Sequence, residues 1–469
     1  MSDKETISQQ QELLVLQSQK IKSLEEKVEL LLDLLQKKNV KKDSHNSSLP
    51  PSSDLFTKNK SLRPVSTRPN GGQIGHKGST LEMSETPDKI IDLKSDFCSV
   101  CGQSFADELF TLKAKRQIIE IPPIIPIYAV RRPKEYRQYN CQCPACQHQQ
   151  LADFPLGVNA PIQYGSSVET LVGYFSVYQF IPFKRLQSLF SQLFSLPLSQ
   201  GSIGNILERS AEKCQGVYQE IKTQILQSSV VGSDETGAKV NGAKWWIWVW
   251  QNRQNTFLVA SDNRGSKTVE EVFENGLPHS AIVSDRWAAQ RNAARLKTNS
   301  KNSLGGTPQI CLAHLLRDLI YLIELEQLDF ATQFKSFIIQ VFENRKTMIE
   351  GNKAFTENSE ETTLLEQTLN RLLLISIDNE KHPKLAVFQV SMIKNRNFIL
   401  PCLYNLEIPP DNNGSERAIR NIKVKQKVSG QFKSGQNAFC VIRSVIDTLL
   451  KRGVELLPCL NQINKLQHV

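Results

Sequence analysis

The stretch from Val230 to Val240 (VVGSDETGAKV) constrains the fold more than any other part of the chain. A short apolar run rich in β-branched residues leads straight into an acidic residue, with glycines on both sides of it. Three more apolar runs follow, at residues 244–250, 256–260 and 281–285, and breaks containing Gly, Asn or Asp separate them. This pattern predicts four strands of one sheet.

The second of these runs is apolar on both faces. Tryptophans at positions 246, 248 and 250 fall on one face, and Trp245, Ile247 and Val249 fall on the other. A strand of this kind requires cover on both sides, so an α/β fold is expected. Asp234 and Asp285 each follow the apolar part of a run, at what is predicted to be the C-terminal end of a strand. Two carboxylates from separate strands are a simple way to hold a divalent metal.

The charge distribution points to a polyanionic partner. The net charge is +10, and from Arg417 to Arg452 nine Lys or Arg side chains face one acid, Asp447. Clustered positive charge beside a metal site favours nucleic acid over a merely solvated surface. The hydrophilic start predicts no signal peptide, and no apolar run reaches membrane-spanning length, so a cytoplasmic protein without a membrane partner is expected.

Ten cysteines in a chain of this length favour a reducing compartment and metal ligation over disulfides. Two CxxC pairs, Cys98/Cys101 and Cys143/Cys146, supply four thiolates for a tetrahedral structural Zn²⁺ in a zinc-ribbon-like module. Cys141 is an alternative ligand in the second pair. Two knuckles without metal in a reduced protein are the competing interpretation.

The first forty residues carry a heptad repeat. Apolar residues recur every seven positions from Ile7 to Leu35, with Leu24 and Leu31 at the second core position. This pattern predicts a parallel coiled coil that joins two or more copies, although a helix packed on its own chain is the alternative. The Ser-, Pro- and Lys-rich segment that follows is predicted to be a flexible basic linker.

Residues 164–228 are predicted to be helical, with a break at Pro182 and a turn near Gly201. Helix, short turn and helix resemble a helix-turn-helix, so this region is a candidate DNA-binding unit. Its second helix has few basic side chains, and a purely structural helical pair fits nearly as well.

A helix is also predicted from Cys311 to about Glu326, and further helices to about residue 400. Cys311 and His314 have i,i+3 spacing, but a half-buried helix face is the better interpretation for Cys311. His314 is placed to face the active site, and His314 and Arg317 are candidate DNA contacts.

Glu416 is the candidate third acid. Pro409 and Pro410 end the preceding segment, and Asn412 or Asn413 can cap a new helix. Alone, Glu416 fits a capping box after Asn413 or an i,i+4 pair with Arg420. Together with the two aspartates, it is a credible third metal ligand.

Three carboxylates suit two Mg²⁺ or Mn²⁺ ions about 4 Å apart, which clamp the attacking and leaving oxygens of a phosphodiester. Basic side chains of the following helix are then placed to hold the DNA backbone beside the cut. They are Arg417, Arg420, Lys423 and Lys427.

The chain resembles transposases of the insertion sequence 66 family over nearly its whole length. The resemblance rests on the zipper-like start and the zinc-knuckle region, and on the motifs SSLPPSSD (47–54), GGQIGHKG (71–78), SDETG (233–237), SDRW (284–287), CLAH (311–314) and DNNGSER (411–417). Two features depart from the family pattern: CxCxxC replaces a simple CxxC, and Leu312 stands where Trp is usual.

The resemblance implies an RNase H-like catalytic core of the DDE type, with Asp234, Asp285 and Glu416 as its catalytic triad. It implies binding of terminal inverted repeats and target DNA in a bacterial, nucleoid-associated protein, with companion transposition proteins possible. The expected organisation is a coiled coil (1–42), linker (43–89), zinc module (90–155), helical region (156–228), catalytic domain (229–452, helical insertion about 307–405) and C-terminal tail (453–469).

The sequence therefore predicts a Mg²⁺-dependent DNA transposase that cuts at the element's ends and joins the 3′-hydroxyls to target DNA. A zinc-dependent DNA-binding regulator without catalytic activity and a metal-dependent nuclease without strand transfer are the alternatives.

Overall fold

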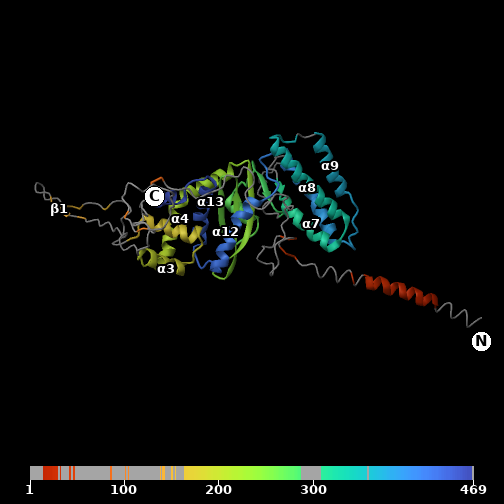
Figure 1. The fold of residues 1–469 in the computed structure, drawn as a ribbon, viewed down its shortest axis with the longest axis horizontal. Coiled ribbons are helices and arrows are strands. Elements are labelled where there is room, and N and C mark those ends of the chain that lie inside the picture. Colours follow the sequence, from red (N-terminus) through yellow and green to blue (C-terminus); the bar gives the residue numbers. More distant parts are fainter. Residues whose placement is uncertain are drawn as a thin grey trace, which may run out of the picture.

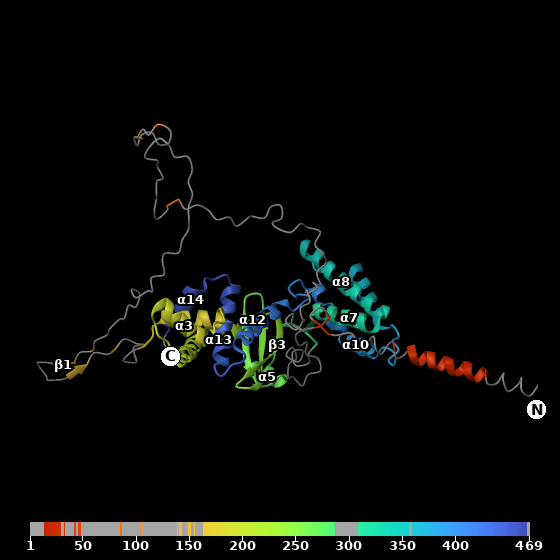
Figure 2. The same ribbon diagram turned by 60° about the horizontal axis from the view of Figure 1, so that its bottom comes forward.

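The structure is a computed structural model, and it describes residues 163–286, 308–355 and 359–466, together with residues 14–29 and a few short pieces before residue 163. A mixed five-stranded sheet lies between two groups of helices (Figure 1). Helices α3, α4, α13 and α14 gather at one end of it, and α7, α8 and α10 at the other (Figure 2). The chain is a mixed α/β protein in which helix predominates.

The sheet has the strand order β5-β4-β3-β6-β7. β3 (Val230–Val240), β4 (Ala243–Gln251) and β5 (Thr256–Ser261) form an antiparallel meander. β6 (Ala281–Ser284) pairs parallel with β3, and β7 (Pro308–Ile310) pairs parallel with β6. The four predicted strands are thus confirmed. β7 was not predicted, because it has only three residues and begins at a proline.

The apolar residues of β4 lie in the main core. Ile247, Trp248, Val249 and Trp250 are all buried, so both faces of this strand are covered, as predicted. Trp248 and Trp250 stack with ring centroids 5.6 Å apart, and Trp250 meets the edge of Phe273. Burial of such large rings is among the strongest contributions to the stability of a core.

Helices satisfy the outer edge of β5. Tyr218 of α4 (Gln200–Leu226) donates a hydrogen bond to the carbonyl oxygen of Leu258 at 2.7 Å. The hydroxyl of Ser444 on α13 (Gln436–Lys451) accepts from the Leu258 amide at 2.9 Å, and Thr448 accepts from the Thr256 amide. A paired edge of this kind cannot recruit another strand.

The predicted helices of residues 164–228 are present. α2 (Ser166–Gly173) continues as a π-helix (Tyr174–Tyr178), and α3 (Phe183–Phe194) packs on α4 around Ile203 and Ile206. α4 begins at Gln200, where the hydroxyl of Ser199 accepts from the Ser202 amide. α14 (Leu456–Lys465) lies against α2.

A second core forms among the helices between β7 and α12 (Asn413–Ser429). Its phenylalanines include Phe330, Phe334 and Phe388, with Phe334 and Phe388 in edge-on contact. The helices are α7 (Leu312–Glu326), α8 (Asp329–Glu350), α9 (Glu360–Leu373), α10 (Pro383–Lys394), a 3₁₀ turn (Arg396–Phe398) and α11 (Pro401–Tyr404). These helices occupy the stretch predicted as an insertion.

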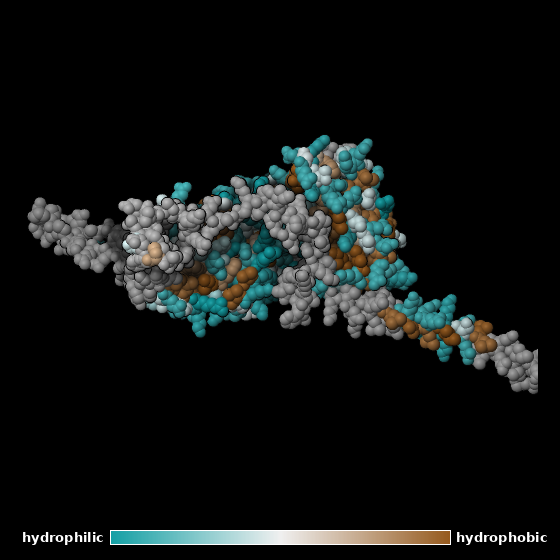
Figure 3. Space-filling model, viewed as in Figure 1, coloured by the Kyte–Doolittle hydropathy of each residue, from teal (hydrophilic) through white to brown (hydrophobic). Residues whose placement is uncertain are grey.

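Residues 14–29 form a helix whose side chains are all exposed. Its apolar positions include Leu14, Ile21, Leu24 and Val28, at least half of each side chain being accessible. Figure 3 shows these brown residues among teal ones along the helix. A few residues of the predicted linker are described, and one of them, Asn46, donates a hydrogen bond to Glu324 on α7 at 2.7 Å.

The predicted zinc cysteines lie largely outside the described residues. Cys98, Cys143 and Cys146 are not described, and Cys101 lies exposed in a turn. Cys141 lies in β1 (Asn140–Gln142), which pairs with β2 (Gln149–Leu151) in an antiparallel hairpin. The zinc ligand set therefore stays a prediction. Among the described residues, none of the helices has the length and apolarity needed to cross a membrane.

Candidate active site

Asp234 lies within β3 rather than at its end. β3 stops pairing with β6 after Gly232, but it continues beside β4, where Asp234 is opposite Val249. The predicted strand end is therefore wrong for the strand as a whole, because the long β3–β4 hairpin extends it. The prediction holds for the parallel half of the sheet, since Asp234 comes two residues after Gly232, the last residue of β3 that pairs with β6.

Asp285 follows the last residue of β6, as predicted. The next residue, Arg286, is anchored in the helices: it forms an ion pair with Asp318 of α7 and lies over the ring of Phe388 at 5.5 Å. This anchor ties the end of β6 to α7 and α10, and it fixes the backbone next to Asp285.

Glu416 lies in the first turn of α12, whose N-cap is Asn412. The Asn412 side chain donates to the carbonyl oxygen of Ser233 at 2.7 Å and accepts from the hydroxyl of Ser415 at 2.7 Å. One buried amide thus joins the start of α12 to the residue before Asp234.

Two glycines allow this close approach of helix and sheet. A Cβ atom on Gly232 would lie 2.4 Å from Nε2 of Gln251 and 2.8 Å from Oδ1 of Asn412. A Cβ atom on Gly414 would lie 2.5 Å from the same Nε2 atom. A side chain at position 232 would have to displace Gln251, Asn412 and Ser415, and one at position 414 would have to displace Gln251.

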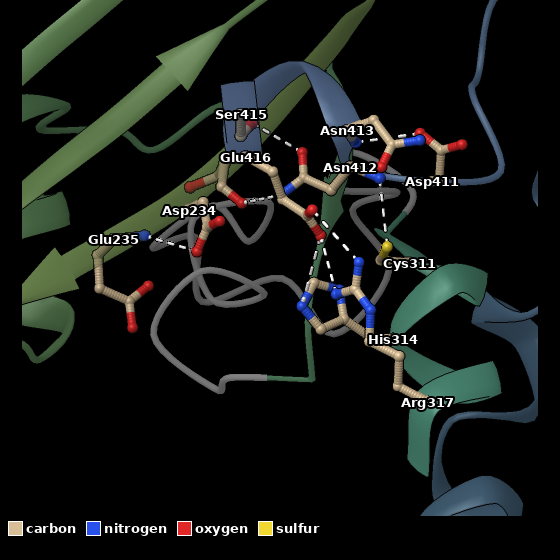
Figure 4. A network of polar contacts seen from close by, with 11 residues as sticks. Asp234, Glu235, Cys311, His314, Arg317, Asp411, Asn412, Asn413, Ser415 and Glu416 are labelled. Atoms are coloured by element: carbon tan, nitrogen blue, oxygen red, sulfur yellow. Dashed lines mark hydrogen bonds and ion pairs between the residues drawn. The ribbon is translucent and has the colours of Figure 1, made fainter. Parts of the chain in front are cut away.

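The three carboxyl groups share one electrostatic environment. Burial raises the pKa of Asp234 well above its usual value, and the negative charges of Glu235, Asp285 and Glu416 raise it further. Asp234 and Glu416 lie close together in Figure 4, while the side chain of Glu235 points away from them. Glu235 instead pairs with Arg264 at 2.8 Å. Strands β3 and β6 and helix α12 therefore bring the charges of Asp285 and Glu416 close enough to act on Asp234.

Glu416 is held by α7. Arg317 donates to both of its carboxylate oxygens, at 3.2 and 3.4 Å, and Nε2 of His314 lies 3.7 Å from Oε1 (Figure 4). The sequence alone allowed Glu416 to form a capping box after Asn413 or to pair with Arg420. The described partners of its carboxylate are instead His314 and Arg317 on α7. His314 faces Glu416, as predicted, and Arg317, which was predicted as a DNA contact, lies on the same side of α7. The contact of either residue with DNA stays a prediction.

Burial lowers the pKa of His314, and the positive charge of Arg317 lowers it further, against the opposite effect of Glu416. Cys311, His314 and Glu416 each place a ligand atom within 4.8 Å of the others, a geometry that can hold a metal. However, burial raises the pKa of Cys311 to about 12, and its sulfur accepts from the Asn412 amide at 3.2 Å. Cys311 thus has a structural role at the start of α12.

The basic residues of α12 lie on two sides of the helix. At about 100° per residue, Arg420, Lys423 and Lys427 fall on the same side as Glu416. Arg420 and Lys427 are exposed, whereas burial lowers the pKa of Lys423, which contacts the carbonyl oxygen of Gly237. Arg417 lines a separate groove instead. The four residues that were predicted as one group are therefore divided.

A family profile described as Transposase IS66 family matches residues 162–439, which is more than half of the 469-residue chain. A second profile, described as a family of unknown function (DUF6444), matches residues 2–82. No curated protein matches the chain.

Proposed function

Because the chain belongs to the IS66 family of transposases, we propose that it cleaves phosphodiesters at the terminal inverted repeats of a mobile element and joins the freed 3′-hydroxyls to target DNA. The observation that supports this most is that Glu416 lies beside Asp234 (Figure 4) and that the charges of Asp285 and Glu416 both act on Asp234. The order of the strands, an antiparallel meander followed by two parallel strands, is consistent with an RNase H-like core.

The donor set suits Mg²⁺ or Mn²⁺. All three groups offer carboxylate oxygens. Burial raises the pKa of Asp234 most, and the charges of the neighbouring acids raise it further; a cation would neutralise those charges. When bound, two such ions supply activation of the attacking oxygen and stabilisation of the leaving oxygen. Asp234, Asp285 and Glu416 would hold them.

The remaining residues of the site act on the substrate. In this proposal, Arg420 and Lys427 hold the phosphate backbone along α12, since both are exposed on the side of Glu416. Arg317 is positioned to transfer from Glu416 to a phosphate once the carboxylate has another partner, because its guanidinium suits both anions. His314 stays within reach of the same carboxylate.

The N-terminal part is proposed to assemble and stabilise the protein. The exposed apolar positions of residues 14–29 would pair two or more copies as a coiled coil, so that both element ends are held together. Cys98, Cys101, Cys143 and Cys146, with Cys141 as an alternative, are proposed to ligate structural Zn²⁺.

The test is a cleavage and joining assay with Mg²⁺ on DNA that carries an element end. Asp234→Asn and Glu416→Gln should abolish both steps, whereas exposed controls Asp262→Asn and Glu350→Gln should retain them. Wild-type activity in both site variants would refute the assignment. Cutting without joining would indicate a nuclease, and chelator-insensitive DNA binding without nicking would indicate a regulator.

A further inference from the structure

A groove lies on the other side of the loop that leads into α12. It encloses about 1130 Å³ and is formed by residues 227–230, the β4–β5 turn, residues 406–414 and side chains of α12 and α13. A second hollow of about 420 Å³ continues from it and shares Gln227, Ser228, Asn252 and Gln254. The groove exceeds the upper range for small-molecule pockets, about 1,000 Å³, and suits an extended polymer.

Its lining combines positive charge with side-chain amides. Arg253, Arg417 and Lys451 face the larger hollow and Arg452 the smaller one, against the two acids Glu407 and Asp411. The amides come from both walls of the groove, and they are Gln227, Gln251, Asn252, Gln254, Asn412 and Asn413. Arginine and side-chain amides are the groups that form paired hydrogen bonds with guanine and adenine edges.

The β4–β5 turn is held rigidly at the groove. Lys451 donates to the carbonyl oxygens of Asn252 and Asn255 at 2.8 and 2.9 Å, and to the side chain of Gln251 at 2.8 Å. The Asn252 side chain accepts from the amide of Gln254 at 2.9 Å. The turn therefore presents the exposed side chains of Arg253 and Gln254 in a fixed place.

Four lining side chains remain available to a ligand. Arg253, Gln254, Arg417 and Gln227 have no side-chain hydrogen bond or ion pair within residues 163–286, 308–355 and 359–466. A rigid backbone that carries polar side chains without partners is expected of a recognition surface, because binding then costs little backbone conformational entropy.

The groove adjoins the candidate active site. Gly232 lines it two residues before Asp234, and Asn413 and Gly414 line it just before Glu416. Arg417 lies about a quarter turn around α12 from Glu416, at about 100° per residue. A strand that passes through the groove therefore runs next to the acids.

We propose that this groove binds a DNA strand with unpaired bases, and that Arg253, Gln254 and Arg417 contact its base edges and phosphates. This inference rests on the proposed function, because the strand belongs to DNA processed at the three acids. The strand we propose is donor DNA that flanks the element end, where bases are unpaired beside the cut.

The full-length protein is tested with three DNA probes. One is an end duplex with an unpaired flanking strand, the second is the same duplex with a blunt end, and the third is a supercoiled plasmid as target. Arg253→Gln/Arg417→Gln should weaken binding of the forked duplex about tenfold or more and leave blunt-end binding within a factor of about two. Arg371→Gln, an exposed position on α9, is the matched control and should bind as wild type.

Gln254→Ala separates base contact from charge. It should weaken binding of the forked duplex without changing the salt dependence, whereas the arginine variant should lower the salt slope by about two. Loss with the forked probe supports the groove as the site for the flanking strand. Loss confined to joining into the plasmid would assign the groove to duplex target DNA and would overturn the inference of an unpaired strand.

Equal losses on forked and blunt duplexes, or no loss on any probe, would overturn the inference. A failure of the proposed function would give a different result from a failure of the groove inference. A wild-type protein that binds the forked duplex but neither cuts nor joins would refute the transposase chemistry, while the variant's weaker binding would still support the groove.

Discussion

Replacement of Arg317 by glutamine should strengthen the binding of divalent metal in the absence of DNA. Arg317 donates to both oxygens of Glu416, and the two side chains are 19% and 25% exposed, so the pair is partly shielded from water. A metal ion that uses Glu416 must displace the guanidinium from at least one oxygen. Hydrogen bonds to charged groups contribute about 1.5–3 kcal/mol, and partial exposure places this pair near the lower value.

If the metal no longer has to break an Arg317–Glu416 interaction worth about 1.4 kcal/mol, its affinity rises about tenfold. We therefore expect Arg317→Gln to tighten Mn²⁺ binding about tenfold in calorimetric titrations of the DNA-free protein, and Arg317→Lys to have a smaller effect, because lysine lacks the fork. Arg371→Gln is the control. Equal or weaker metal binding by Arg317→Gln would refute the competition between Arg317 and metal at Glu416.

Three further predictions concern pH, packing and assembly. The pKa of Asp234 is raised by burial and by neighbouring acids, so a proton must leave before metal binds. Mn²⁺ affinity should therefore keep rising with pH above the range in which an ordinary aspartate titrates, and Asp234→Asn should remove most of that dependence. Gly232→Ala places a Cβ atom 2.4 Å from Gln251 and should lower stability by about 1–3 kcal/mol in thermal melts, whereas Gly216→Ala, with nothing within 4 Å, should not destabilise. Leu24→Glu should lower the mass measured by light scattering if the exposed helix pairs copies, and an unchanged mass would contradict that pairing.

The sheet was predictable because its signal is local. Alternating tryptophans and short apolar runs separated by Asn and Gly specify β3, β4, β5 and β6 without reference to distant residues. β7 escaped because three residues beginning with Pro308 carry almost no periodicity. Its pairing depends on β6, which lies more than twenty residues earlier in the chain.

The acids were predictable individually, but their partners were not. Glu416 was recognisable after two prolines at a helix start, whereas its pairing with Arg317 joins residues 99 positions apart. The division of the basic residues could have been predicted, since Arg417 differs by about 100° from Glu416 on any α-helix. The close approach at Gly232 depends on Gln251 and Asn412, which only the fold brings together.

The most direct test of the central claim is the anomalous X-ray scattering of Mn²⁺ in crystals of the full-length protein. Convergence of the acids predicts metal peaks coordinated by carboxylate oxygens of Asp234, Asp285 and Glu416, with Arg317 withdrawn from Glu416. Metal bound only away from these residues, or on the two aspartates while Glu416 stays paired with Arg317, would contradict it.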